Sequence, residues 1–122
     1  MPATPSPRQA SVASWFDTEP AHVLCQLEFQ RLTPLLAERP VTPWLWVAPT
    51  ATWAALPDLP GRGLRLHRDG AGFAGDTRCG LPLPLPDESV NAIVLQHVTA
   101  RDAEQLIGEC ERVLMPGGRL WL

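Results

Sequence analysis

The C-terminal part of this chain constrains its fold most, because residues 81–122 combine two apolar runs with a helical pattern between them. The first run, residues 90–95, is followed by a stretch with helical periodicity, by Pro116-Gly117-Gly118 and by a second apolar run. A strand, a helix and a strand joined in this way form a β-α-β unit with parallel strands and a right-handed crossover. Parallel sheets covered by helices bind ligands at the carboxyl ends of their strands. The residues that follow each strand are therefore the first place to look for a site.

The predicted helix of this unit has a continuous apolar stripe. Thr99 and Asp102 form a pair that resembles a capping box, with Asp in the place of Glu, and they predict the helix start. Apolar residues then recur at helical spacing. They are Ala103, Leu106, Ile107, Cys110, Val113 and Leu114. We interpret Gly117-Gly118 as a helix stop rather than a phosphate-binding loop, because the pair follows a helix instead of preceding one.

A second helix is predicted in the N-terminal part. Thr18 is a suitable cap for a helix that begins at Glu19-Pro20, since proline is tolerated in a first turn. Pro34 should kink or restart this helix, and Pro40 should end it.

The middle of the chain predicts two more strands. Residues 44–48 are an apolar run between Pro43 and Pro49 and indicate a buried strand. A short helix over residues 50–56 should follow, and then a second strand over residues 64–67. The glycine-rich residues 69–75 should turn.

Composition excludes several classes of protein. The chain is 45% hydrophobic, enough for a core, and its net charge of −3 without a basic stripe argues against nucleic-acid binding. The first residues contain no apolar run of the kind that a secretory signal needs, so no secretory signal is expected. No apolar run approaches the roughly 18 residues that a membrane helix needs. The three cysteines form no C-x-x-C pair, so neither a metal site nor a disulfide framework is expected. A reduced, cytoplasmic protein is the simplest interpretation.

Two segments resemble a known family. Residues 83–98, LPLPDESVNAIVLQHV, and residues 111–122, ERVLMPGGRLWL, resemble the class I S-adenosylmethionine-dependent methyltransferases, in particular their type 11 group. The resemblance implies an α/β fold with a Rossmann-like parallel sheet of strand order 3-2-1-4-5 in a three-layer α/β/α arrangement. In the family a final hairpin usually follows; this chain ends before it, so we expect a fragment of a longer protein. Residues 1–14 are expected to be a flexible tail and residues 15–122 a single methyltransferase-like domain.

The resemblance also implies S-adenosylmethionine as cofactor, held at the ends of strands one, two and four. His97, after strand four, is the candidate catalytic residue, with a helix-entry role as the alternative. Asp69 matches the family's ribose-binding acid only loosely, and a solvated turn aspartate is the alternative. The residues that the resemblance assigns to the cofactor are Ala48, Pro49, Thr50, Ala51, Asp69 and Gln96.

The first cofactor loop departs from the family pattern. The family has an acid and three glycines there, and glycine lets the backbone approach the cofactor closely. In this chain the acid position is Val47, and the glycine positions are Pro49, Ala51 and Trp53. Trp53 is expected to fill the pocket. Trp44 and Trp46 alternate on the preceding strand, where a core role and stacking on an adenine are both open.

Two functions therefore remain open. One is an S-adenosylmethionine-dependent methyltransferase of weak or lost activity, with an unknown methyl acceptor. The other is a non-catalytic protein of the same fold that works through partner binding or self-association as a homo-oligomer, with the exposed edge at Leu122 as one contact surface. A nicotinamide-dependent oxidoreductase is less favoured because G-x-G-x-x-G is missing. Neither membrane attachment nor a metal is expected.

Overall fold

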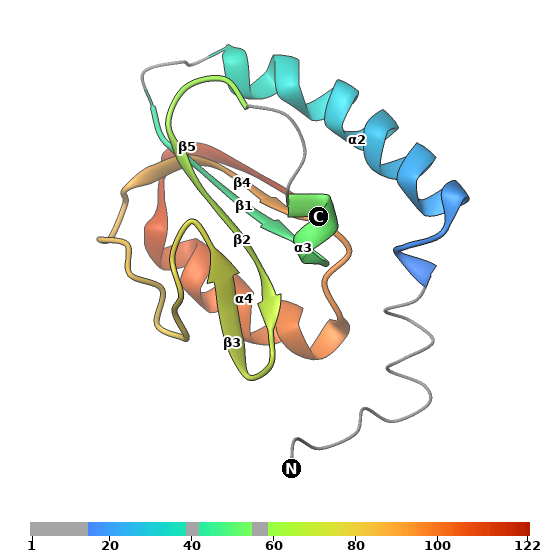
Figure 1. The fold of residues 1–122 in the computed structure, drawn as a ribbon. Helices are drawn as coiled ribbons and strands as arrows, with labels where there is room; N and C mark the ends of the chain where they lie inside the picture. Colours follow the sequence, from blue (N-terminus) through green and yellow to red (C-terminus); the bar gives the residue numbers. More distant parts are fainter. Residues whose placement is uncertain (1–14, 39–41, 55–58) are drawn as a thin grey trace.

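The computed structural model describes residues 15–38, 42–54 and 59–122. Figure 1 shows a twisted sheet with α2 along one face and α4 across the other, so the fold has three α/β/α layers. The predicted tail, residues 1–14, and Pro40 lie outside the described residues. In chain order the elements are α2 (Glu19–Ala37), β1 (Trp44–Ala48), α3 (Ala51–Ala54), β2 (Gly63–Asp69), β3 (Gly72–Gly75), β4 (Val90–Leu95), α4 (Ala100–Val113) and β5 (Leu114–Trp121).

The sheet has the strand order β3-β2-β1-β4-β5, which confirms the predicted order and the Rossmann-like α/β class. The pairs β1–β2, β1–β4 and β4–β5 are parallel, as the β-α-β pattern predicts. The edge strand β3 differs, because it pairs antiparallel with β2 and makes the sheet mixed. Only Gly70 and Ala71 connect the two strands, and so short a connection closes a hairpin rather than a crossover.

The central strand β1 is buried along its whole length. Its side chains alternate between the two layers: Trp44, Trp46 and Ala48 belong to the core on the α2 side, and Leu45 and Val47 to the core on the α4 side. A strand covered on both faces needs apolar residues at every position, which explains its continuous apolar run. The tryptophans of β1 are thus core residues.

The helix α2 begins as predicted. The N–H of Ala21 donates to the Thr18 side chain at 3.4 Å, and proline stands in the first turn. The helix then runs through Pro34 to Ala37 as one element, so Pro34 does not restart it, and the alternative of a kink at Pro34 stays a prediction. Pro34 is exposed, so the carbonyl group that it leaves without a helical partner can bond to water.

The helix α4 also has the predicted cap, since the Asp102 N–H donates to the Thr99 hydroxyl at 3.2 Å. Leu106, Cys110 and Val113 are buried against the sheet, whereas Ile107 lies at the margin of the stripe and is 41% exposed. The fold contains no described helix that is both long and apolar enough to span a bilayer.

The predicted stop at Pro116-Gly117-Gly118 takes a different form. The helix ends at Val113, and β5 begins at Leu114. The pairing of β4 with β5 shifts register between Val90–Leu114 and Ala92–Arg119, so the Pro-Gly-Gly residues form an irregularity inside the strand. Gly117 has φ +78°, a conformation that suits glycine, and it lets the chain resume pairing at Arg119.

An ion-paired network holds the segment before β4 against α4. Arg112 donates from Nη1 to the carbonyl of Leu85 at 2.7 Å and to Asp87 Oδ1 at 2.9 Å. Glu109 accepts from Arg112 Nη2 at 2.7 Å and from the N–H of Leu83 at 2.8 Å. The side chain of Glu109 is only 15% exposed, and the Arg112 guanidinium lowers the pKa of this carboxyl. The proline-rich turn is therefore attached to the helix by charged hydrogen bonds.

Candidate functional site

The predicted cofactor residues lie at the carboxyl ends of three adjacent strands. Ala48 ends β1 and pairs with His67 of β2, and Val47 pairs with Leu95 of β4. Ala48 and Gln96 are therefore on neighbouring strands, as the resemblance implies. Asp69 lies two residues beyond His67, at the β2–β3 hairpin, and is farther along its strand than the end of β1.

The loop after β1 is short and turns at once into a helix. Ala48 is buried, and Thr50 caps α3 by accepting from the Trp53 N–H at 3.3 Å. The N–H of Ala54 donates to the Thr50 carbonyl at 3.0 Å. The hydroxyl and the carbonyl of Thr50 are thus used by the first turn of α3, and Pro49 has no N–H to offer a ligand.

Trp53 occupies the space beside these strand ends. Its side chain is buried, with 2% of the residue exposed, and its Nε1 donates to the carbonyl of Phe16 at 3.0 Å. Its ring lies edge to face against two others, with centroids 5.2 Å from Phe16 and 5.4 Å from His97. Residues from the start of the described chain, from α3 and from the end of β4 therefore meet in one aromatic cluster of Phe16, Trp53 and His97.

His97 joins this cluster to α2. Its Nε2 lies 2.6 Å from Glu28 Oε1 and 3.1 Å from Glu28 Oε2. The side chains of His97 and Glu28 are 36% and 27% exposed. His97 has φ +51°, a conformation that few residues other than glycine adopt, and it precedes the cap of α4. A catalytic role for His97 stays a prediction.

Gln96 points into the core on the α2 side. It is 3% exposed, and its Oε1 accepts from Trp46 Nε1 at 3.1 Å. Its Nε2 is buried without a hydrogen-bond partner among the described residues. Cys25 of α2 is close enough for its thiol to interact with Gln96, and burial, with a smaller contribution from Glu28, raises the pKa of that thiol to about 11. The Cys25 thiol therefore stays protonated and unreactive.

The predicted ribose ligand, Asp69, has a partner on the surface. Its Oδ2 accepts from Arg78 Nη1 at 2.8 Å, with the two side chains 47% and 80% exposed. The other carboxylate near this edge, Asp76, accepts from the backbone N–H of Arg65 at 2.8 Å. Both carboxylates hold the β2–β3 region together.

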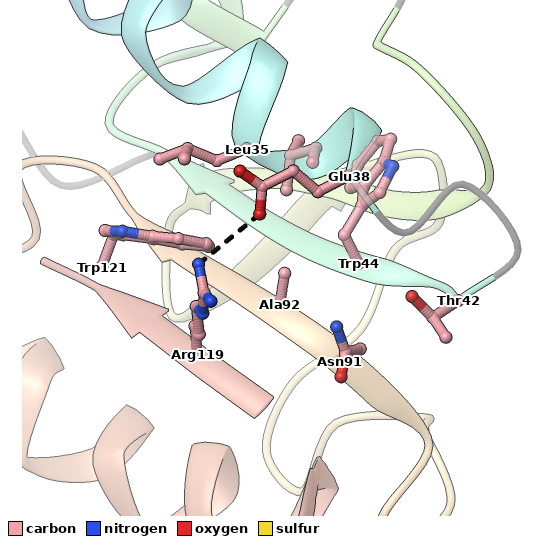
Figure 2. Close-up of a pocket in the computed structure, with 9 residues that line it drawn as sticks. Leu35, Glu38, Thr42, Trp44, Asn91, Ala92, Arg119 and Trp121 are labelled. Atoms are coloured by element: carbon pink, nitrogen blue, oxygen red, sulfur yellow. Dashed lines mark ion pairs between the residues drawn. The ribbon is translucent and has the colours of Figure 1, made fainter. Parts of the chain in front are cut away.

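Three hollows of the described surface lie elsewhere. Two of them, of about 450 and 330 Å³, are lined at the amino ends of the strands by Trp44, Arg62 and Gly63. A third, shown in Figure 2, holds only about 20 Å³ beneath the end of α2, where Arg119 Nη1 lies 3.6 Å from Glu38 Oε2. That volume suits about one water molecule. None of these three hollows is lined by a predicted cofactor residue.

Sequence reasoning missed Phe16, which belongs to the aromatic cluster, and Glu28, which contacts His97 of that cluster. Phe16 is separated from Trp53 by 37 positions, and Glu28 from His97 by 69. One signal was present for Glu28, an acid among the apolar residues of α2. Across the described ranges, no group of three or more His, Cys, Asp or Glu residues is arranged to hold a metal ion.

The comparisons with known proteins agree with the resemblance. Residues 70–122 match the model of a family described as a methyltransferase domain. The matched part contains β3, β4, α4 and β5, and both segments that carry the resemblance. The recognition of this family is therefore confirmed, over residues 70–122. Neither the curated proteins nor the solved structures that were compared contained a match to the chain.

Proposed function

From the methyltransferase-domain match over residues 70–122, we propose that this chain is a methyltransferase-fold protein that does not bind S-adenosylmethionine at the family site and that acts through protein contacts. The observation that carries the proposal is the position of Trp53. Its buried indole lies between Phe16 and His97, beside the strand ends where the family holds its cofactor.

The first cofactor loop does not fit the group that the family binds. The family acid is replaced by Val47, which is buried in the apolar core on the α4 side. Pro49 and Ala51 stand where glycines would let a ligand approach the backbone. The hydroxyl and the carbonyl of Thr50 accept hydrogen bonds from α3.

A comparison of magnitudes identifies the decisive obstacle. The Asp69–Arg78 pair is exposed, and such pairs contribute about 0 to 1 kcal/mol, so a ribose could displace Arg78 at little cost. Removing a buried tryptophan from its packing costs about 3 to 5 kcal/mol. Since about 1.4 kcal/mol is a tenfold change in affinity, moving Trp53 would weaken cofactor binding by two orders of magnitude or more.

The alternative is an active S-adenosylmethionine-dependent methyltransferase in which Trp53 and Phe16 move aside. The family match and the position of Gln96-His97 at the end of β4 favour it. Its methyl acceptor is unknown. The two functions differ in one measurable property, which is the affinity for the cofactor.

Calorimetric titration with S-adenosylmethionine and with S-adenosylhomocysteine tests the proposal. We expect no binding heat at ligand concentrations up to about 100 µM, for a chain whose folding is verified by circular dichroism and a cooperative thermal transition. A Kd in the low micromolar range for the unaltered chain would overturn the proposal and favour the active enzyme.

A further inference from the structure

The outer face of α2 presents an exposed ridge of four residues. Glu19, Val23, Leu27 and Arg31 follow one another at intervals of four, so they form one continuous row on the helix surface. All four are exposed, and Val23 and Leu27 are 49% and 55% exposed. Figure 1 shows this helix along the outside of the sheet, and no other described helix or strand lies over its outer face.

This ridge is unusual because the opposite face of α2 already forms the core. Ala21, Cys25 and Leu36 are buried against the sheet. A helix that covers a sheet normally has a polar outer face, and apolar residues on both sides indicate a second contact. Val23 and Leu27 are neighbours in one row, unlike the scattered apolar residues of an ordinary surface.

The order of residue types along the ridge is self-complementary. It reads acid, apolar, apolar, base from Glu19 to Arg31. If a second copy of α2 runs antiparallel across a two-fold axis at the level of residue 25, Glu19 faces Arg31 of the partner and Val23 faces Leu27 of the partner. Each contact then occurs twice, as two-fold symmetry requires.

We propose that this chain forms a homodimer through the ridge Glu19–Val23–Leu27–Arg31 of α2, paired antiparallel with the same ridge of a second copy. The inference rests on the proposed function in one respect only, that association rather than catalysis is the role of the fold. The apolar pair supplies the attraction, and the charges at either end set direction and register. Neither Glu19 nor Arg31 forms an ion pair with another described residue.

The edge of β5 is a weaker candidate for the same contact. It carries Leu120 and Leu122, which are 36% and 77% exposed. However, Pro116 and the register irregularity interrupt the backbone groups that a partner strand would pair with. The ridge of α2 has no such interruption.

Sedimentation equilibrium at protein concentrations up to about 200 µM tests the dimer. We expect a concentration-dependent monomer–dimer equilibrium for the unaltered chain, and a dissociation constant at least tenfold weaker for Leu27→Glu. The matched control is Leu120→Glu, the same change on β5, which should leave the equilibrium unchanged. A monomer at every concentration, or dissociation by Leu120→Glu and not by Leu27→Glu, would overturn the proposal.

Charge exchange tests the antiparallel register. Arg31→Glu and Glu19→Arg each place like charges opposite one another, and each should weaken the dimer severalfold at low salt. The double variant Glu19→Arg/Arg31→Glu should restore the original association, because opposite charges then face each other again. If the double variant is as weak as the single ones, this register is wrong. Circular dichroism of all variants checks that α2 is intact. The cofactor titration tests the proposed function independently of the dimer.

Discussion

The carboxyl ends of β4 and β1 lie on adjacent strands, yet they are built in different ways. The segment around β4 has the features of the family: a proline-rich turn, a capped helix and the Gln96-His97 pair. The segment after β1 has the predicted strand, but Pro49 and Trp53 stand where the resemblance places glycines. The core that defines the fold and the loop that would hold a cofactor are therefore separable, because packing constrains only the first.

The strand β1 shows why the fold tolerates the altered loop. Its five residues are buried by contacts with both layers, and these contacts do not involve the loop backbone. Trp53, in the short helix after β1, adds a large buried side chain to the core on the α2 side. The segment after β1 is thus part of the core.

The largest expected effect comes from removing this added core residue. Trp53→Ala should lower the free energy of unfolding by about 3 to 5 kcal/mol, because a buried indole and its hydrogen bond to Phe16 are lost. Urea denaturation measures the change. Trp15→Ala is the control, since Trp15 is 43% exposed and its removal should cost less than about 1 kcal/mol. Equal effects of the two changes would mean that Trp53 is not a core residue.

A comparable loss is expected on the β4 side, from the helix that covers it. Leu106→Ala should cost about 2 to 5 kcal/mol, since Leu106 is 1% exposed in the core on the α4 side. Ile107→Ala, one position along the same helix, should cost far less because Ile107 is 41% exposed. Urea denaturation of both variants measures the two losses in free energy of unfolding. A larger loss for Ile107→Ala than for Leu106→Ala would contradict the described orientation of α4.

The smallest effect concerns the charged network before β4, and it depends on pH. Because Arg112 lowers the pKa of Glu109 in the folded state, the ionised carboxyl stabilises the fold above its unfolded pKa. That contribution is lost as the pH falls through the lower, folded pKa. Glu109→Gln should therefore cost about 1 kcal/mol at pH 7 and progressively less in acid. Urea denaturation of the unaltered chain and of Glu109→Gln at several pH values measures the difference in free energy of unfolding. A difference that stays constant from pH 7 to the acid range would contradict the prediction.

Much of the fold follows from local patterns. Thr18 and Thr99 cap their helices as predicted, because a cap depends on residues three positions apart. The strand over residues 44–48 was predicted with its observed bounds, since its apolar run lies between two prolines. The start of β5 was missed, because an irregular ladder admits Pro116 and two glycines that normally indicate a turn.

The candidate site was only partly predictable. The sequence located the strand ends and identified Pro49, Ala51 and Trp53 as departures from the glycine pattern, with Trp53 expected to fill the pocket. It carried no information on the residues that hold Trp53 in place.

The sequence by itself determined the order of the elements other than β3, the caps and the two-sided burial of β1, because these depend on spacing and on apolar periodicity within a few residues. The strand β3 was predicted as part of a turn over residues 69–75. Only the tertiary structure decided what lies over the strand ends. Phe16 reaches Trp53 across 37 positions and Glu28 reaches His97 across 69, and such contacts exist only once α2 has packed on the sheet. The exposed ridge of α2 was likewise visible only after packing had determined which face of the helix is covered.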